Sequence, residues 1–337
     1  DNFAAQVCAV VSVIVDGWAS ARPGSLVITK ITGGNTNSLY KVEYTHIKDS
    51  VILRIFGAGT ERFIDRRTEN AALAQLSLRG IAPTFHGLFE NGRVEGYVEG
   101  RDLQPEELRL PRVVEAVSQQ MALLHRQHID LGDHCTIWGK TKSLLEMIEG
   151  RTTNPVVFKG IDVTALLKKA REFEKIYTHT QSTLLALFAL GAVFTHNDLL
   201  SFNIMVPAGF FESTPGVSVT FIDFEYASYN CRAFDIANHF CGKGYGNNLI
   251  IFTNIGYHQN IAGSNFVKKY IHAWRCLSPG DMDYCVDDRF ISGFENVVLL
   301  NVILSHLLWG CWSLVQASYA ESDFGFLEYA KKRLHAF

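Results

Sequence analysis

The chain has 337 residues, 47% of them hydrophobic and 19% charged, which is the composition of a soluble globular protein with a sizeable core. Its 31 Lys and Arg against 34 Asp and Glu give a net charge of −3, which excludes the strongly basic surface of a nucleic-acid binder or a polybasic membrane protein. A chain of this length usually builds more than one core, so we expect two packed units.

The cysteines are scattered, odd in number and free of any C-x-x-C pair. They are Cys8, Cys135, Cys231, Cys241, Cys276, Cys285 and Cys311. A zinc site or a disulfide framework is therefore not expected, and a reducing cytoplasm is the expected compartment.

Two apolar runs have to be judged against membrane insertion. Val7–Val15 is too short to span a bilayer and lacks a basic lead-in, so we predict a buried terminal helix. Val297–Val315 is long enough, but Asn301, Ser305 and His306 interrupt it, which favours a central buried helix of a large lobe. We expect no stable membrane insertion.

The first hundred residues have the pattern of a small sheet. Residues 26–44 alternate β-branched or aromatic with polar side chains around Gly33-Gly34, which predicts a strand, a turn and a strand. Residues 51–57 predict a third strand, and helical spacing of apolar residues follows from about 65 to 78. Asn91-Gly92 is then a hairpin signal.

After residue 100 the pattern changes to long amphipathic helices, predicted over 111–128 and 163–191. Two short apolar segments, 192–206 and 217–227, interrupt the helices, and each leads into a polar cluster.

The sequence therefore predicts an α+β protein of two lobes. A small β-rich lobe over 1–100 would bind a nucleotide, and a larger, mainly helical lobe over 101–337 would hold the polar clusters at the junction. This is the layout of a nucleotide-binding cleft.

The stretch "FTHNDLLSFNIMV" contains the first polar cluster. Asp198 and Asn203 have the spacing of the kinase catalytic loop, H-R-D-x-x-x-x-N, with Asn197 in place of the Arg. A carboxylate there would take the proton of an attacking alcohol, and the amide oxygen would ligate Mg²⁺. The alternative is an Asx turn with a capping Asp, which occurs in many loops.

The second cluster is "FIDFEY", in which Asp223 follows an apolar strand. A second metal-binding carboxylate belongs at this place in a phosphotransferase. By itself an Asp after a strand is more often a turn residue, but three oxygen ligands in this order are much less expected by chance.

The small lobe contains candidate phosphate contacts. A Gly-rich loop between strands lets backbone N–H groups approach phosphates, and its residues are Gly33, Gly34, Asn35, Thr36 and Asn37. Arg54 lies among apolar residues of a strand and needs an anionic partner, which Glu69 on the following helix could supply. The alternative is an edge-strand Arg that faces water.

These residues resemble the choline/ethanolamine kinase family, and the similarity extends from about residue 28 to the end of the chain. The segments that carry it are "GGNTNSLYKV", "VILRIFGAGTERFIDRRTEN", "HNDLLSFNIM", "FIDFEYASYNCRAFDIANHF" and "WGCWSLVQASYAESDFGFLEYAKKR". "HNDLL" is more similar to the ethanolamine branch, whereas "EELRLP" is similar to choline kinases.

The resemblance implies a protein-kinase-like fold that uses ATP and Mg²⁺ to phosphorylate ethanolamine or choline for phospholipid synthesis. Asp198 would be the catalytic base, Asn203 and Asp223 the metal ligands, and Glu69 would orient Arg54 toward the phosphates. The backbone near Tyr97, Val98 and Glu99 would meet the adenine, and the loop from Gly33 to Asn37 would cover the phosphates. The aromatic residues around the substrate ammonium would be Trp309, Trp312 and Tyr329.

The chain departs from the family pattern around the expected amino-alcohol pocket. Gly242 stands where the family has a Glu, a Gly/Asn-rich stretch follows to about residue 263, and Phe202 replaces a frequent Gly. Glu225 or Asp235 could serve as the missing acid. We expect a relaxed choice between the two amino alcohols, and an improved Michaelis constant for ethanolamine in Gly242→Glu.

Three alternatives remain open at this stage. One is a choline-preferring kinase, another is a catalytically silent nucleotide-binding scaffold, and the third is an aminoglycoside-type phosphotransferase. The intact Asp198, Asn203 and Asp223 disfavour the scaffold. The Trp pair, which could also be plain core packing, disfavours a polyamine sugar, for which acidic residues are expected. A homodimer stays open.

Overall fold

The computed structural model describes most of the chain. The described ranges are 2–31, 37–57, 59–60, 64–131, 137–150, 160–188, 191–212, 216–242, 261–277, 286–319 and 325–337, with the main chain alone for 181–188 and 261–264. Gly33, Gly34, Asn35 and Thr36 of the expected phosphate loop lie outside these ranges, as do residues 243–260 of the Gly/Asn-rich stretch.

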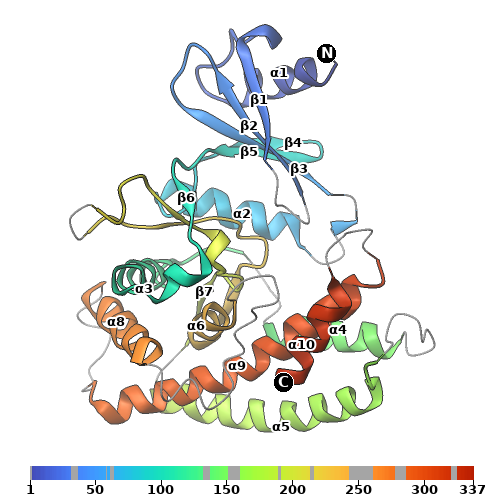
Figure 1. The fold of residues 1–337 in the computed structure, drawn as a ribbon, viewed down its shortest axis with the longest axis vertical. Coiled ribbons are helices and arrows are strands. Elements are labelled where there is room, and N and C mark those ends of the chain that lie inside the picture. The colour runs from blue at the N-terminus through green and yellow to red at the C-terminus, as the bar shows by residue number, and fades with distance from the viewer. Residues whose placement is uncertain are drawn as a thin grey trace.

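A five-stranded antiparallel sheet forms the small lobe (Figure 1). Its spatial order is β1-β2-β3-β5-β4, and the strands are β1 (Leu26–Ile31), β2 (Asn37–Tyr44), β3 (Ser50–Phe56), β4 (Phe85–Phe89) and β5 (Gly92–Gly96). The signal at Asn91-Gly92 corresponds to the tight β4–β5 hairpin. Helix α1 (Asn2–Ile14) buries Val7 and Val11 against this lobe, which confirms the predicted terminal helix.

Helix α2 (Arg66–Leu78) lies between the two lobes (Figure 1). Asp65 caps it by accepting hydrogen bonds from the backbone N–H groups of Arg67 and Thr68. Its apolar residues Leu73 and Leu76 are buried in the hydrophobic core of the large lobe, not in that of the sheet. The helix therefore ties the small lobe to the large one.

The large lobe is a helical assembly. Its helices are α3 (Pro111–His125), α4 (Ile137–Glu149), α5 (Val163–Phe188), α6 (Arg232–Cys241), α8 (Ile261–Leu277), α9 (Asp288–Gln316) and α10 (Phe326–Ala336). Helix α9 packs against α4, α5, α6, α8 and α10. By length and composition it could cross a membrane, but 83% of its most apolar window is buried inside the protein, as predicted for a core helix.

Two small antiparallel sheets hold the polar clusters. One pairs β7 (Ala192–Thr195) with β10 (Ser228–Cys231), and the other has the order β6-β8-β9, made of β6 (Arg101–Asp102), β8 (Ile204–Val206) and β9 (Thr220–Phe221). Gly100 joins the lobes with a φ of 136°, and a Cβ there would lie 2.1 Å from the carbonyl oxygen of Val206. The main chain at Gly100 therefore packs directly against β8, the strand that follows the Asp198–Asn203 motif. The expected two-lobed α+β architecture is confirmed.

Candidate active site

The loop between β7 and β8 takes its shape from a carboxylate on α6. Asp235 accepts hydrogen bonds from the backbone N–H of His196 (2.8 Å) and of Asn197 (2.7 Å). His125 Nε2 lies 3.0 Å from the same carboxylate, and its Nδ1 lies 2.8 Å from the hydroxyl of Tyr270. Burial alone would raise the pKa of Asp235, but the hydrogen bond with His125 and the nearby His196 keep it below its ordinary value. An ionised, buried carboxylate thus fixes the loop.

Asn197 occupies the position of the kinase Arg and is fully buried. Its φ is 65°, which few residues other than Gly, Asn and Asp adopt readily. Its Nδ2 donates to the carbonyl oxygen of Tyr226 and to Ser228 Oγ, both at 2.9 Å, and its Oδ1 accepts from Thr195 Oγ1 at 3.0 Å. The side chain therefore binds this loop to the segment that follows Asp223.

The structure brings Asp198, Asn203 and Asp223 into one site. Asn203 Nδ2 donates to the carbonyl oxygen of Asp198 (2.8 Å), and the N–H of Ile222 donates to the carbonyl oxygen of Asn203 (3.0 Å). Asp223 has a left-handed φ of 66°. Burial, together with the negative charge of Asp223, raises the pKa of Asp198 to about 8. The two carboxylates are therefore electrostatically coupled.

The oxygen atoms of this site fit Mg²⁺. That ion is usually held by one or two carboxylates together with substrate phosphates and water. Because the amide nitrogen of Asn203 is used by Asp198, its amide oxygen is the atom that can face a cation beside the carboxylate of Asp223. Among the described residues, no group of three or more His, Cys, Asp or Glu side chains offers a metal site of another kind.

Arg54 extends from β3 to the site, where it pairs with two carboxylates, Asp223 and Glu95. The sequence alone predicts a pair with Glu69. Arg54 Nη1 lies 3.0 Å from Asp223 Oδ1, while its Nε and Nη2 lie 3.3 and 3.2 Å from Glu95 Oε1. The expected Arg54–Glu69 pair is therefore wrong, because Glu69 binds Arg93 and Arg66 instead. The neighbouring strand β5 presents Glu95 on the face of the sheet that Arg54 occupies, so this carboxylate is nearer than one on α2.

The other expected nucleotide contacts for which the structure describes residues lie in the small lobe and at its connection to the large one. Asn37 begins β2, and its side chain accepts from Arg66 Nη2 (2.9 Å) and donates to Glu225 (3.4 Å). Tyr97, Val98 and Glu99 follow β5 and lead to β6; the N–H of Tyr97 donates to the carbonyl oxygen of Ser50. The main chain of residues 97–99 therefore connects the small sheet to β6 at the junction of the two lobes.

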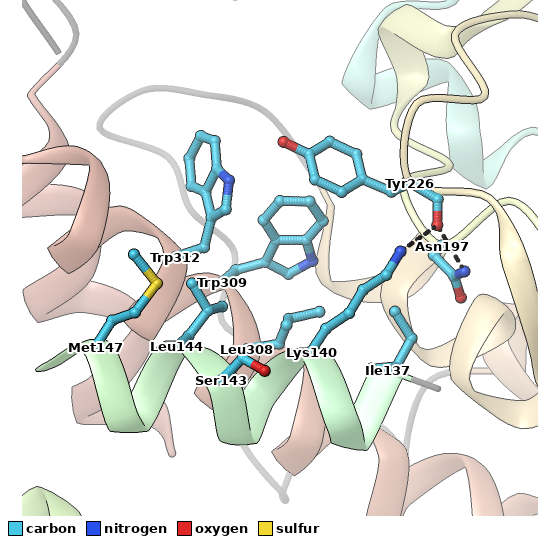
Figure 2. Close-up of a pocket in the computed structure, with 10 residues that line it drawn as sticks. All are labelled: Ile137, Lys140, Ser143, Leu144, Met147, Asn197, Tyr226, Leu308, Trp309 and Trp312. Carbon is cyan, nitrogen blue, oxygen red and sulfur yellow. Dashed lines mark hydrogen bonds between the residues drawn. The ribbon is translucent and has the colours of Figure 1, made fainter. Parts of the chain in front are cut away.

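An aromatic pocket opens beside Asn197, with a volume of about 230 Å³ (Figure 2). Trp309 and Trp312 of α9 meet edge to face at 5.5 Å between ring centroids, and Tyr226 lies 5.1 Å from Trp309. The other lining residues are mainly apolar: Ile137, Lys140, Ser143, Leu144, Met147 and Leu308. The third expected aromatic residue, Tyr329 of α10, does not line this pocket.

Comparison with known proteins adds a family to this geometry. The family model for choline/ethanolamine kinases matches residues 28–337. The chain belongs to this family. A probable ethanolamine kinase A of Dictyostelium discoideum is 26% identical, over 99% of this chain and 90% of that protein. A choline/ethanolamine kinase of Mus musculus is 27% identical, over 94% and 80%. The solved structure of a Plasmodium vivax ethanolamine kinase has a TM-score of 0.77 at 25% identity, over 98% and 87%.

The family Glu expected at position 242 would have to displace Leu200 in this chain. Gly242 is the C-cap of α6, and a Cβ there would lie 2.3 Å from Leu200 Cδ2. Neither suggested substitute reaches the aromatic pocket. Asp235 is fully buried under the catalytic loop, and Glu225 contacts Arg66 and Asn37 at the small lobe.

Sequence reasoning missed the residues that support the site. Asn238 of α6 donates to the carbonyl oxygen of Asn197 (2.9 Å) and accepts from the indole N–H of Trp309 (2.7 Å), so it joins the catalytic loop to the aromatic pocket. Asp235 and His125 were not assigned this structural role either. The signal in the sequence was the segment RAFDIANHFC, in which Arg, Asp, Asn and His stand among apolar residues; the structure buries all of them.

Proposed function

We propose that this protein transfers the γ-phosphoryl group of ATP, in the presence of Mg²⁺, to the hydroxyl group of ethanolamine or choline. The observation that carries the proposal is the arrangement of Asp198, Asn203 and Asp223 in one hydrogen-bonded region, where Asp223 contacts Arg54 of the small lobe, in a chain of this family. An aromatic pocket next to the catalytic loop suits a small cationic alcohol.

Each residue has a role in this reaction. Asp198 accepts the hydroxyl proton as the alcohol oxygen attacks the γ-phosphorus, and its raised pKa suits a general base near neutral pH. Held by Asn203 and Asp223, Mg²⁺ would neutralise charge on the phosphates. Arg54 would donate to the phosphates from β3. The main chain of Tyr97 to Glu99 would meet the adenine.

The pocket walls favour a relaxed choice of amino alcohol. A quaternary ammonium has no N–H donors and is held by ring faces alone, at about 0.5–2 kcal/mol for each good contact. A primary ammonium has to recover hydrogen bonds on leaving water. No carboxylate is among the described residues that line the pocket, and the ammonium of Lys140, which also lines it, donates to the carbonyl oxygen of Tyr226 (3.4 Å), so the ring faces of Trp309, Trp312 and Tyr226 suit choline. The "HNDLL" segment favours ethanolamine instead.

A silent nucleotide-binding scaffold and an aminoglycoside-type phosphotransferase are each disfavoured by a specific feature. A silent scaffold would not need the paired metal ligands and the aligned base that Asp198, Asn203 and Asp223 provide. An aminoglycoside-type activity would need acidic walls for a polyamine sugar, whereas the described residues that line this pocket include no carboxylate and one cation, Lys140.

Steady-state ADP release across ethanolamine, its N-methyl and N,N-dimethyl derivatives and choline tests the proposal. We expect turnover with both ends of the series, and values of kcat/KM that differ by less than about a hundredfold. ADP release that no member of the series stimulates would refute the substrate assignment. A kcat/KM for ethanolamine more than about a thousandfold above that for choline would show that a carboxylate reaches the ammonium. Gly242→Glu is measured alone and together with Leu200→Ala, because Leu200 Cδ2 occupies the space next to a side chain at 242 and has to shift.

A further inference from the structure

Seven charged side chains form a continuous series of ion pairs. Its two ends, Asp223 and Glu225, belong to the large lobe. In order they are Asp223, Arg54, Glu95, Arg93, Glu69, Arg66 and Glu225, with closest N···O distances of 3.0, 3.2, 2.7, 2.5, 2.8 and 3.7 Å. We call this series the inter-lobe charge chain. The signs alternate throughout, and the five middle members all belong to the small lobe.

Arg93 is the midpoint of the inter-lobe charge chain. It lies on β5, is 1% exposed, and faces Arg54 directly across the β3–β5 pair. Two cations in that register repel each other unless carboxylates separate them. Arg93 Nε binds Glu95, and its Nη1 binds Glu69 and Asn70. One planar guanidinium therefore holds the two carboxylates that in turn hold Arg54 and Arg66.

We propose that Arg93 is a positioning residue for phosphoryl transfer, which sets the two guanidinium groups of the small lobe, Arg54 and Arg66, against the loop that carries Asp223. The proposal rests on the function proposed above. Asp198 and Asp223 are not hydrogen-bond partners of Arg93, so it acts only through its two carboxylates.

The direction of its effect follows from the contacts of Glu95. This carboxylate shares its oxygens between Arg93 (Oε2) and Arg54 (Oε1). Without the fork of Arg93, both oxygens can turn to Arg54 and draw its guanidinium away from Asp223 and the phosphates. Lysine cannot replace the fork, since its single ammonium does not span two carboxylates with fixed geometry. Arg93→Lys keeps the charge and removes the positioning.

The test measures the affinity of the purified protein for Mg·ATP by titration calorimetry without any acceptor alcohol. This readout gives an answer even if the acceptor is not an amino alcohol. We expect Arg93→Lys to weaken Mg·ATP binding roughly tenfold, as loss of a charge-assisted contact does. In the ADP-release assay the KM for the amino alcohol should stay within about twofold, since no member of the inter-lobe charge chain is among the described residues that line the pocket.

Val11→Ala is the matched control, because it removes a fully buried apolar side chain of α1, a helix that carries no member of the inter-lobe charge chain. It should lower the melting temperature and leave the Mg·ATP affinity of the folded protein unchanged. Arg93→Lys with the profile of Val11→Ala, less stable but with normal affinity, would overturn the proposal. If Arg93→Lys does not fold, Glu69→Gln replaces it, and an unchanged affinity in that variant has the same meaning.

Discussion

Asn197 and Asp223, one in each of the two loops that meet at the site, hold left-handed backbone conformations. Such conformations cost on the order of 1–3 kcal/mol each unless the surroundings impose them. The surroundings do so for Asn197, whose side chain makes hydrogen bonds on both sides and whose N–H is held by Asp235. One of the two left-handed positions directly precedes Asp198 and the other is Asp223 itself, so these conformations fix the main chain at both carboxylates.

Asp198→Asn should cut turnover by about 10²–10⁴-fold while ATP binding stays nearly unchanged. The amide keeps the shape of the side chain but cannot accept the hydroxyl proton. Measuring kcat and nucleotide affinity on the same preparation separates the two effects. The matched control is Asp162→Asn, which makes the same change at an exposed residue that caps α5. A turnover within about threefold of the parent would exclude Asp198 as the base.

At the scale of elements, α6 organises the site without contributing an expected catalytic residue. Asp235 reaches the catalytic loop, Asn238 reaches both that loop and Trp309, and the helix packs against α9. The helix is buried on all sides, so its polar residues are paired inside the protein.

Asp235→Asn should reduce turnover more than it weakens ATP binding. An amide offers one oxygen to the two N–H groups of His196 and Asn197 and turns an NH₂ toward the other, which costs about 1–3 kcal/mol for the unsatisfied donor. Thermal melting and kcat would both fall. Asp287→Asn caps α9 equally well and serves as the control. Parent-like values of both quantities in Asp235→Asn would show that the loop does not depend on this anchor.

Elements and motif spacing could be predicted from the sequence because periodicity and turn residues are local. The strand 51–57, the helix at 65–78 and the Asp198–Asn203–Asp223 series are of this kind. The Arg54–Glu95 pair depends on the β3–β5 register, and the Asp235 anchor joins residues 39 positions apart, so neither has a local signal. Tyr329 was placed by resemblance alone, and helical spacing could not show on which side of the Trp pair the pocket opens.

At the scale of the whole molecule, the two lobes are not independent units. The apolar face of α2 is buried in the core of the large lobe, and β6, directly after the lobe connection, pairs with β8. Any movement of the small sheet relative to the helices of the large lobe would therefore shift both α2 and β6 against the large-lobe core that holds residues 196–203. The inter-lobe charge chain adds polar contacts at Asp223 and Glu225.

The most direct test of the central claim is to identify the product formed by the purified protein from ATP, Mg²⁺ and ethanolamine or choline, by phosphorus NMR. We predict a phosphomonoester of the amino alcohol that accumulates in a one-to-one ratio with ADP, and no product when Mg²⁺ is chelated. ADP that accumulates together with inorganic phosphate, without a phosphorylated amino alcohol, would contradict the account.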